Sequence, residues 1–272
     1  MTHLLDIPHA DFAQDGRSPQ PIRHHLAEHE LLSVEAVAAL ADRLPASTVE
    51  HAQAKGIGVV VPGGATMLDA SPGEVARGIE SNGCWMVLKH IEQDPQYKRL
   101  LDDALDEIAP LLPGGAEAML RRQGFIFLSA PESVTPAHLD FEHNFLLQIR
   151  GQKTMHTGQF ASPEDEQREL ERSNSSAAHR NMEYAPEWTA EWDLRPGDGL
   201  YVPVGKPHWV QNGPTVSVSL SITWRSADGL RAEHVHAFNE RLRRAGVSPR
   251  RPGERPRIDQ GKALLHRVYD KA

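Results

Sequence analysis

Residues 135–153 read TPAHLDFEHNFLLQIRGQK, and this stretch decides how the chain is interpreted. It places a histidine and a carboxylate, His138 and Asp140, two positions apart and ahead of an alternating apolar run. Residues two apart in a strand face the same side, so these two side chains would converge on one point. A tight turn around Gly151 then leads into the next strand. The stretch therefore predicts a β-hairpin with a pair of metal-binding side chains beside it.

A third ligand has to come from another strand, and His208 is the best candidate. It follows Pro207 and opens a strand after the turn-rich segment GLYVPVGKP at 199–207. Two imidazoles and one carboxylate form the facial triad of non-haem Fe(II) oxygenases, which leaves coordination positions open for an oxo-acid and O₂. We therefore expect His138, Asp140 and His208 to bind iron.

Lys153 lies thirteen residues after Asp140, at the start of the strand that follows the turn. A lysine that points into a barrel is costly unless an anion pairs with it, and a dicarboxylate cosubstrate would supply that anion. The alternative is a solvated hairpin lysine, the usual location of this residue type. Thr135 and Asn144 flank the histidine and aspartate and offer further hydrogen bonds.

Together these residues resemble the core of the JmjC-type, cupin-fold 2-oxoglutarate-dependent oxygenases, and are closest in motif to the asparaginyl hydroxylases of that family. A second stretch, GDGLYVPVGKPHWV at 197–210, resembles the family's segment before its distal histidine. The resemblance covers about 120–226. It implies a double-stranded β-helix that uses Fe(II) and takes 2-oxoglutarate as cosubstrate.

The same resemblance implies roles for particular side chains. The iron ligands would be His138, Asp140 and His208. Lys153 and Thr135 would bind the distal carboxylate of 2-oxoglutarate, and Asn144 would lie beside the cosubstrate.

The chain departs from the family's pattern at two points. The family carries an asparagine two residues before a tryptophan on its last strand, whereas Ile222 stands two residues before Trp224 here. Ser221 and Thr223 are the candidates to replace that asparagine. The upstream tyrosine that contacts the same carboxylate in the family has no alignable counterpart in this sequence.

The sequence predicts three regions. Residues 1–120 read as a mixed helical and strand region that packs on the core. Residues 121–226 alternate with period two between turn signals, which is typical of a β-sandwich or barrel; we expect a jelly-roll or cupin core with a polar insert at 159–186. Residues 227–272 read as C-terminal helices. Four tryptophans are expected in the core or a pocket wall: Trp188, Trp192, Trp209 and Trp224.

Capping signals locate two helices in the N-terminal region. Ser33 precedes an amphipathic run that ends at Arg43, and Asp94 precedes Pro95 at the first position of a second run. The insert at 159–186 is polar and poor in aromatic residues, which predicts a loop that could serve as a lid.

Composition excludes several classes of protein. The 272 residues carry a net charge of −8, which opposes a broad nucleic-acid surface. The single cysteine, Cys84, cannot form an intrachain disulfide or a multi-thiolate metal site. No stretch approaches the roughly 20 apolar residues of a membrane span, and the first residues contain no signal-peptide run. We therefore expect a cytoplasmic protein with neither a nucleic-acid nor a membrane partner.

The sequence thus predicts an Fe(II)- and 2-oxoglutarate-dependent dioxygenase. It would hydroxylate a peptide, a protein side chain or a small molecule and release succinate and CO₂. One alternative is a non-catalytic cupin-fold binding or regulatory protein. Another is a metal-dependent cupin isomerase or hydrolase.

The C-terminal helices carry an apolar stripe that could pair two subunits into a homodimer. The alternative is that this stripe packs on the chain's own barrel. The residues of the stripe are Leu230, Val235, Phe238 and Leu242.

Overall fold

The structure, a computed structural model of the whole chain, describes residues 3–7, 18–53, 69–174 and 182–269. The large sheet is formed by β1 (Leu5–Asp6), β2 (Gln20–His24), β3 (Val49–Gln53), β4 (Cys84–Lys89), β5 (Leu120–Ser129), β7 (His143–Arg150), β10 (Asp198–Val202) and β12 (Ser217–Arg225). The small sheet is formed by β6 (Val134–His138), β8 (Lys153–Gln159), β9 (Glu187–Leu194) and β11 (His208–Asn212).

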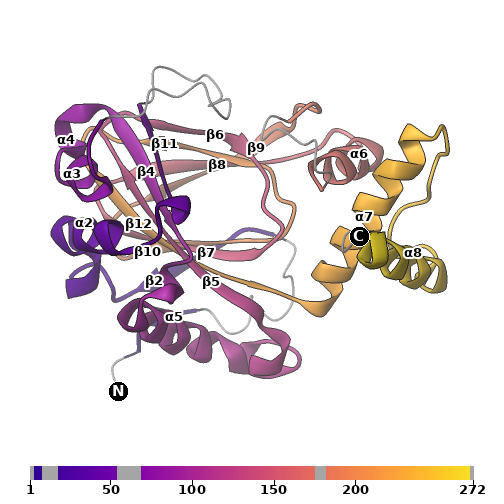
Figure 1. Cartoon of the computed structure of the whole chain (residues 1–272), viewed down its shortest axis with the longest axis horizontal. Helices are drawn as coiled ribbons and strands as arrows, with labels where there is room; N and C mark the ends of the chain where they lie inside the picture. Colours follow the sequence, from indigo (N-terminus) through magenta and orange to yellow (C-terminus); the bar gives the residue numbers. More distant parts are fainter. Residues whose placement is uncertain (1–2, 8–17, 54–68, 175–181, 270–272) are drawn as a thin grey trace.

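The two sheets are antiparallel and face each other (Figure 1). The large sheet has the order β1-β2-β10-β7-β12-β5-β4-β3, and the small sheet has the order β6-β11-β8-β9. From β5 to β12 the chain crosses repeatedly between the sheets, as in a double-stranded β-helix. The predicted fold class, mainly β with helices around a jelly-roll core, is confirmed.

The tight turn between β7 and β8 fixes which residues face the interior. Gly151 has a φ of +71°, and a Cβ atom there would lie 2.4 Å from the carbonyl oxygen of Val216. Only glycine combines that backbone conformation with that close approach. Because a slip of one residue would turn every side chain of β8 to the other face, this turn sets the direction of Lys153.

The inner and outer faces of the large sheet carry different side chains. On β12, Ser217, Ser219 and Ser221 face the small sheet. The intervening apolar residues of β12 join the main hydrophobic cluster on the outer face. A smaller apolar cluster between the sheets includes Leu146 of β7 and Met155 of β8, which shows that the two sheets pack face to face. Short polar side chains therefore share the interior with a limited apolar core.

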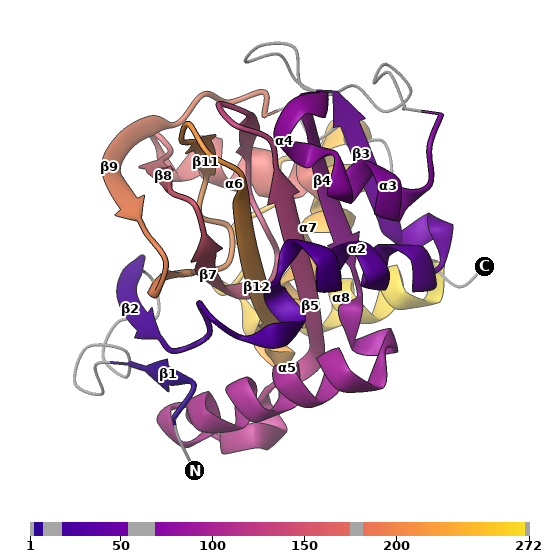
Figure 2. The same cartoon turned by 90° about the vertical axis from the view of Figure 1, so that its left-hand side faces the viewer.

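Helices of the N-terminal region cover the outer face of the large sheet, and Figure 2 shows α2 and α5 in front of it. Ser33 caps α2 by accepting from the Ala36 amide, and Asp94 caps α5 by accepting from the Gln96 amide. Both helices begin where the sequence predicts. The helices of this region are α2 (Val34–Arg43), α3 (Pro72–Arg77), α4 (Ile79–Asn82) and α5 (Pro95–Ile108). Short 3-10 helices accompany them: η1 (Glu30–Leu32), η2 (Ala46–Thr48), η3 (Ile91–Gln93), η4 (Ala109–Leu111) and η5 (Gly115–Ala118).

The predicted loop at 159–186 was wrong in part, because residues 163–173 form the helix α6 (Pro163–Ser173). Ser162 caps this helix and Pro163 occupies its first turn. The buried residues of α6 are polar, so the sequence of this segment has no helical pattern of apolar residues from which to predict the helix. Residues 175–181 of the same segment lie outside the described residues.

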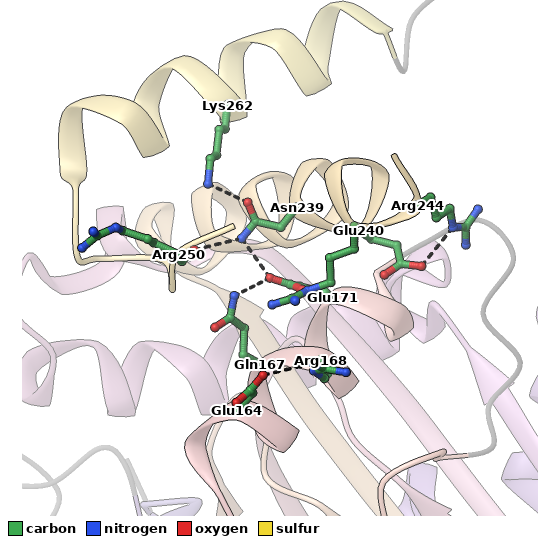
Figure 3. Close-up of polar contacts among 10 residues, drawn as sticks. Glu164, Gln167, Arg168, Glu171, Asn239, Glu240, Arg244, Arg250 and Lys262 are labelled. Atoms are coloured by element: carbon green, nitrogen blue, oxygen red, sulfur yellow. Dashed lines mark hydrogen bonds and ion pairs between the residues drawn. The ribbon is translucent and has the colours of Figure 1, made fainter. Parts of the chain in front are cut away.

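Helix α6 packs with α7 (Ala227–Arg244) and α8 (Pro256–Tyr269) at one end of the molecule (Figure 1). The fully buried carboxylate of Glu171 accepts hydrogen bonds from Gln167 at 2.6 Å and Asn239 at 2.9 Å, and pairs with Arg243. Asn239 in turn accepts a hydrogen bond from Lys262 of α8 at 2.7 Å, so one polar network joins the three helices (Figure 3). The partners offset the cost of burying the charge of Glu171.

Within the described ranges, no helix has both the length and the apolar composition that crossing a bilayer requires.

Candidate active site

The small sheet brings His138 and His208 side by side. His138 is the last residue of β6 and His208 is the first residue of β11, and the antiparallel register pairs them directly. Their ring centroids are 4.2 Å apart. Asp140 lies two residues beyond the end of β6, in a loop rather than in the strand. The expected convergence of the three side chains is therefore present, although a loop and not strand alternation turns the carboxylate inward.

The carboxylate of Asp140 reaches both histidines. Its Oδ1 lies 3.9 Å from Nε2 of His138, and its Oδ2 lies 3.6 Å from Nε2 of His208. One ligand atom from each residue falls within 4.8 Å of the other two, an arrangement that can hold one metal ion. Among the described residues, no other group of three or more His, Cys, Asp or Glu side chains brings its ligand atoms within 4.8 Å of one another.

Backbone carbonyls fix the tautomer of both imidazoles. Nδ1 of His138 lies 2.7 Å from the carbonyl oxygen of Pro136, and Nδ1 of His208 lies 2.9 Å from that of Lys206. A carbonyl oxygen can only accept, so each Nδ1 carries the proton and each Nε2 keeps a free lone pair. This is the form that binds a metal, with the other ring nitrogen held by a hydrogen-bond acceptor.

Burial also favours the metal-binding form of His208. The side chain is 3% exposed, and burial, followed by the neighbouring His138 ring, lowers the pKa of His208 to about 4. The imidazole is therefore neutral at pH 7, as a metal ligand has to be.

A backbone hydrogen bond ties the two loops of the triad together. The amide of Gly205 donates to the carbonyl oxygen of Asp140 at 2.8 Å, and Gly205 has a φ of +73°. This bond connects the loop that carries Asp140 to the segment that leads into His208. Gly205 was not among the residues predicted from the sequence; its place in a Pro-Val-Gly-Lys-Pro turn is the signal that could have identified it.

Lys153 points into the interior from the other end of β8. It is paired with Asn212 of β11, whereas His208 is paired with Thr157, four residues further along β8. The lysine is 5% exposed, and burial lowers its pKa to about 7. The structure gives its ammonium group no hydrogen bond or ion pair with any described residue. The alternative of a solvated hairpin lysine does not hold in this structure.

Thr135 and Asn144 also lie on inner faces. Thr135 is half-buried on β6 and pairs with Val210, which belongs to the cluster between the sheets. Asn144 on β7 is buried, and its Oδ1 accepts a hydrogen bond from the hydroxyl of Ser221. The structure thus places all six predicted side chains at the inner faces of the barrel strands or at the loop beside them.

Ile222, at the position where the family carries asparagine, faces away from this interior. It belongs to the main hydrophobic cluster on the outer face of the large sheet. Of the two candidates to replace the asparagine, Thr223 donates to the carbonyl oxygen of Gln123 at 3.1 Å, whereas Ser221 meets Asn144. The alternation VSVSLSITW at 216–224 indicates that Ser221 shares a face with the other inner serines.

The inner face near the metal-binding residues has one further polar pair that the sequence analysis missed. The indole Nε1 of Trp192 donates to the hydroxyl of Thr157 at 3.0 Å. Thr157 lies directly opposite His208 in the sheet. This bond satisfies a buried hydroxyl beside the metal-binding residues and orients the Trp192 ring toward the interior.

Comparisons with known proteins bear on the family and the fold. Residues 114–230 match the family model of the JmjC domain. A search of curated proteins finds no match to the chain.

Among solved structures, the fold resembles that of the Escherichia coli ribosomal oxygenase YcfD, with a TM-score of 0.58 and 16% sequence identity over 99% of this chain and 68% of that one. A structure of YcfD in complex with cobalt and 2-oxoglutarate matches with a TM-score of 0.58 and 15% identity, over 98% and 68% of the two chains. A third, in complex with cobalt and succinic acid, matches with a TM-score of 0.56 and 16% identity, also over 98% and 68%.

Proposed function

Because residues 114–230 match the JmjC domain model, we propose that this chain is an Fe(II)- and 2-oxoglutarate-dependent dioxygenase. The observation that carries the proposal is the pairing of two features on one sheet. A triad of ligands in the metal-binding tautomer stands at one end of β8 and β11. A buried lysine without a partner among the described residues stands at the other end.

The donor set fits a non-haem iron site. His138 and His208 would each offer Nε2, and Asp140 would offer one carboxylate oxygen. When bound, the metal supplies the activation of O₂ that couples oxidation of 2-oxoglutarate to succinate and CO₂ with hydroxylation of the substrate. The three side chains would hold the metal, and the carbonyls of Pro136 and Lys206 orient the two imidazoles for that role.

The cosubstrate would lie along the interior, between the triad and Lys153. The ammonium group of Lys153 would pair with the distal carboxylate, and the anion would restore the protonated form that burial disfavours. The hydroxyl of Thr135 would add a hydrogen bond to the same carboxylate. Asn144, held by Ser221, would lie beside the cosubstrate.

A polypeptide is the substrate class that we favour. The residues at 135–153 resemble the motif of the asparaginyl hydroxylases, and the fold resembles that of a ribosomal oxygenase. Both point to a side chain of a peptide or protein ahead of a small molecule, and to hydroxylation as the reaction. We place the protein in the cytoplasm, consistent with its single cysteine.

We also propose a homodimer through the C-terminal helices. Val235 of the predicted α7 stripe is only 1% exposed within this chain. Helix α8 instead presents exposed apolar side chains, which a second subunit could cover. These are Ile258, Leu264, Leu265 and Val268, between 48% and 64% exposed. Light scattering after size exclusion should give twice the chain mass, and Leu264→Glu with Val268→Glu should give the monomer.

The test of the enzymatic proposal is the formation of succinate from 2-oxoglutarate by the purified protein with Fe(II) and ascorbate. We expect turnover in the wild type and none in His208→Ala. A protein that binds metal without consuming 2-oxoglutarate would instead fit the isomerase or hydrolase alternative. A protein that binds neither metal nor 2-oxoglutarate would fit the non-catalytic alternative.

A further inference from the structure

The outer face of the small sheet carries a cluster of aromatic rings. Trp209 of β11 and His156 of β8 are stacked, with ring centroids 3.9 Å apart and an interplanar angle of 3°. Trp188 of β9 meets Trp209 edge to face at 6.3 Å. These side chains project from the same strands as the triad, but from the opposite side of the sheet, because Trp209 and His156 alternate with the inward-facing His208 and Thr157. Figure 2 shows these strands along the left-hand side of the molecule.

Gly158, which has no side chain, leaves room for the indole of Trp188 on this face. Trp188 pairs with Gly158 of β8, at a shift in the register of the two strands. A Cβ atom on Gly158 would lie 3.0 Å from Cε3 of Trp188 and 2.6 Å from the carbonyl oxygen of Glu187, so the indole lies directly over the glycine. Trp188 is nevertheless 43% exposed, more than any other Phe, Tyr or Trp side chain whose exposure the structure describes. Exposed aromatic surface of this kind marks interaction sites.

Negative charge surrounds the rings. Glu191 lies opposite His156 in the sheet, its carboxylate is 3.4 Å from the imidazole Nδ1, and its side chain is 74% exposed. Asp193, also exposed, accepts a hydrogen bond from Thr154 at 2.7 Å. Along β9 the outer face therefore combines aromatic faces with carboxylates, which is the combination that attracts organic cations.

We propose that this aromatic–acidic face, formed by His156, Trp188, Glu191 and Trp209, binds a basic segment of a partner polypeptide. An arginine or lysine side chain lies on the exposed indole of Trp188, and its charge is paired with Glu191. Single-stranded nucleic acid also stacks on tryptophan, but its phosphates would be repelled by Glu191 and Asp193. This binding goes beyond the proposed oxygenase activity and requires no metal.

The test uses the full chain without metal and a fluorescein-labelled octapeptide that alternates arginine and glycine. Fluorescence anisotropy should show binding that weakens with salt. Trp188→Ala should weaken binding about fivefold, the range of an exposed cation–π contact. Glu191→Lys should weaken it about tenfold, because it replaces an attraction with a repulsion. Matched substitutions at exposed sites elsewhere, Val247→Ala and Glu80→Lys, should stay within about twofold of the wild type.

Three results would overturn the proposal: equal binding by the wild type and both variants of the face, equal binding of a peptide with citrulline in place of arginine, or tighter binding of an oligouridine than of the basic peptide. Circular dichroism checks that the variants fold. Succinate formation by Trp188→Ala and Glu191→Lys, without peptide, should equal that of the wild type. Loss of peptide binding and loss of the oxygenase activity are therefore separate outcomes.

Discussion

The two ends of the β8–β11 pair differ in how far the protein satisfies its own polar groups. At the triad end, the Nδ1 atoms of His138 and His208 have carbonyl partners, and Asp140 lies between the two rings. At the other end, Lys153 is buried and lacks a partner among the described residues, and the adjacent Asn212 leaves its Oδ1 without one. The first end is assembled before any ligand binds, whereas the second is incomplete until an anion arrives. Substitutions at the two ends should therefore have different consequences.

The largest effect is expected at the assembled end. Asp140→Ala removes the anionic ligand, and succinate formation should fall by about 1000-fold, or ~4 kcal/mol at ~1.4 kcal/mol per tenfold. The melting temperature should change little, because the half-exposed carboxylate supports no buried hydrogen bond of the fold. Asp193→Ala, on the outer face of the same sheet, is the control and should keep wild-type turnover. Turnover in Asp140→Ala equal to the wild type would contradict the triad.

At the incomplete end, Lys153→Met should raise the KM for 2-oxoglutarate by about 100-fold, because a buried charge-assisted hydrogen bond contributes roughly 3 kcal/mol. The same substitution should raise the melting temperature of the free protein, since it removes an ammonium group that burial disfavours. Turnover assays and calorimetry measure the two effects. The exposed Lys98→Met is the control for both. A lower melting temperature together with an unchanged KM would mean that Lys153 serves the fold alone.

The pH dependence of 2-oxoglutarate binding should also distinguish the end that carries Lys153 from the triad end. With a pKa of about 7, Lys153 is neutral in the free protein above that pH. Each pH unit above 7 should then weaken binding of 2-oxoglutarate up to tenfold, because the free protein must take up a proton to bind the dianion. Titration calorimetry at pH 7, 8 and 9 measures this slope. Lys153→Met should show a flat profile, and a flat profile in the wild type would exclude the lysine as the titrating group.

The smallest effect is expected between the two ends, at Ser221. Ser221→Ala removes the donor that holds Asn144, and the KM for 2-oxoglutarate should rise about fivefold, equivalent to the ~1 kcal/mol of one neutral hydrogen bond. Ser219→Ala is the matched control, since Ser219 donates to Gln148 instead. An equal rise in both variants would point to general loosening of β12, with no specific role for Ser221.

Much of the site could be predicted because its signals are local. The turn at Gly151 determines where Lys153 points, since one glycine sets the register of the whole strand. The spacing of His138 and Asp140 identified the two residues, although a loop rather than strand alternation turns Asp140 inward. The N-caps Ser33 and Asp94 were equally local signals. Helix α6 was missed because its buried residues are polar and give no apolar stripe, although Ser162 and Pro163 at its start form the same local signal as Asp94 and Pro95.

The two tryptophans of β9 show where the alternation of side chains along a strand predicts the wrong face. Trp188 and Trp192 are four residues apart on β9, so alternation predicts one face for both. The register shift opposite Thr157 and Gly158 places them on opposite faces. Trp192 therefore packs inside, as expected, whereas the expectation that Trp188 lies in the core or a pocket wall was wrong. A bulge depends on the neighbouring strand, and a single strand's sequence does not reveal it.

The most direct test is a crystal structure grown without oxygen in the presence of Mn²⁺ and 2-oxoglutarate. We expect one metal ion bound to Nε2 of His138, Nε2 of His208 and the carboxylate of Asp140. We also expect the distal carboxylate of 2-oxoglutarate to lie within hydrogen-bond distance of the Lys153 ammonium group. A metal bound elsewhere, or a cosubstrate that leaves Lys153 without an anionic partner, would contradict the proposed site.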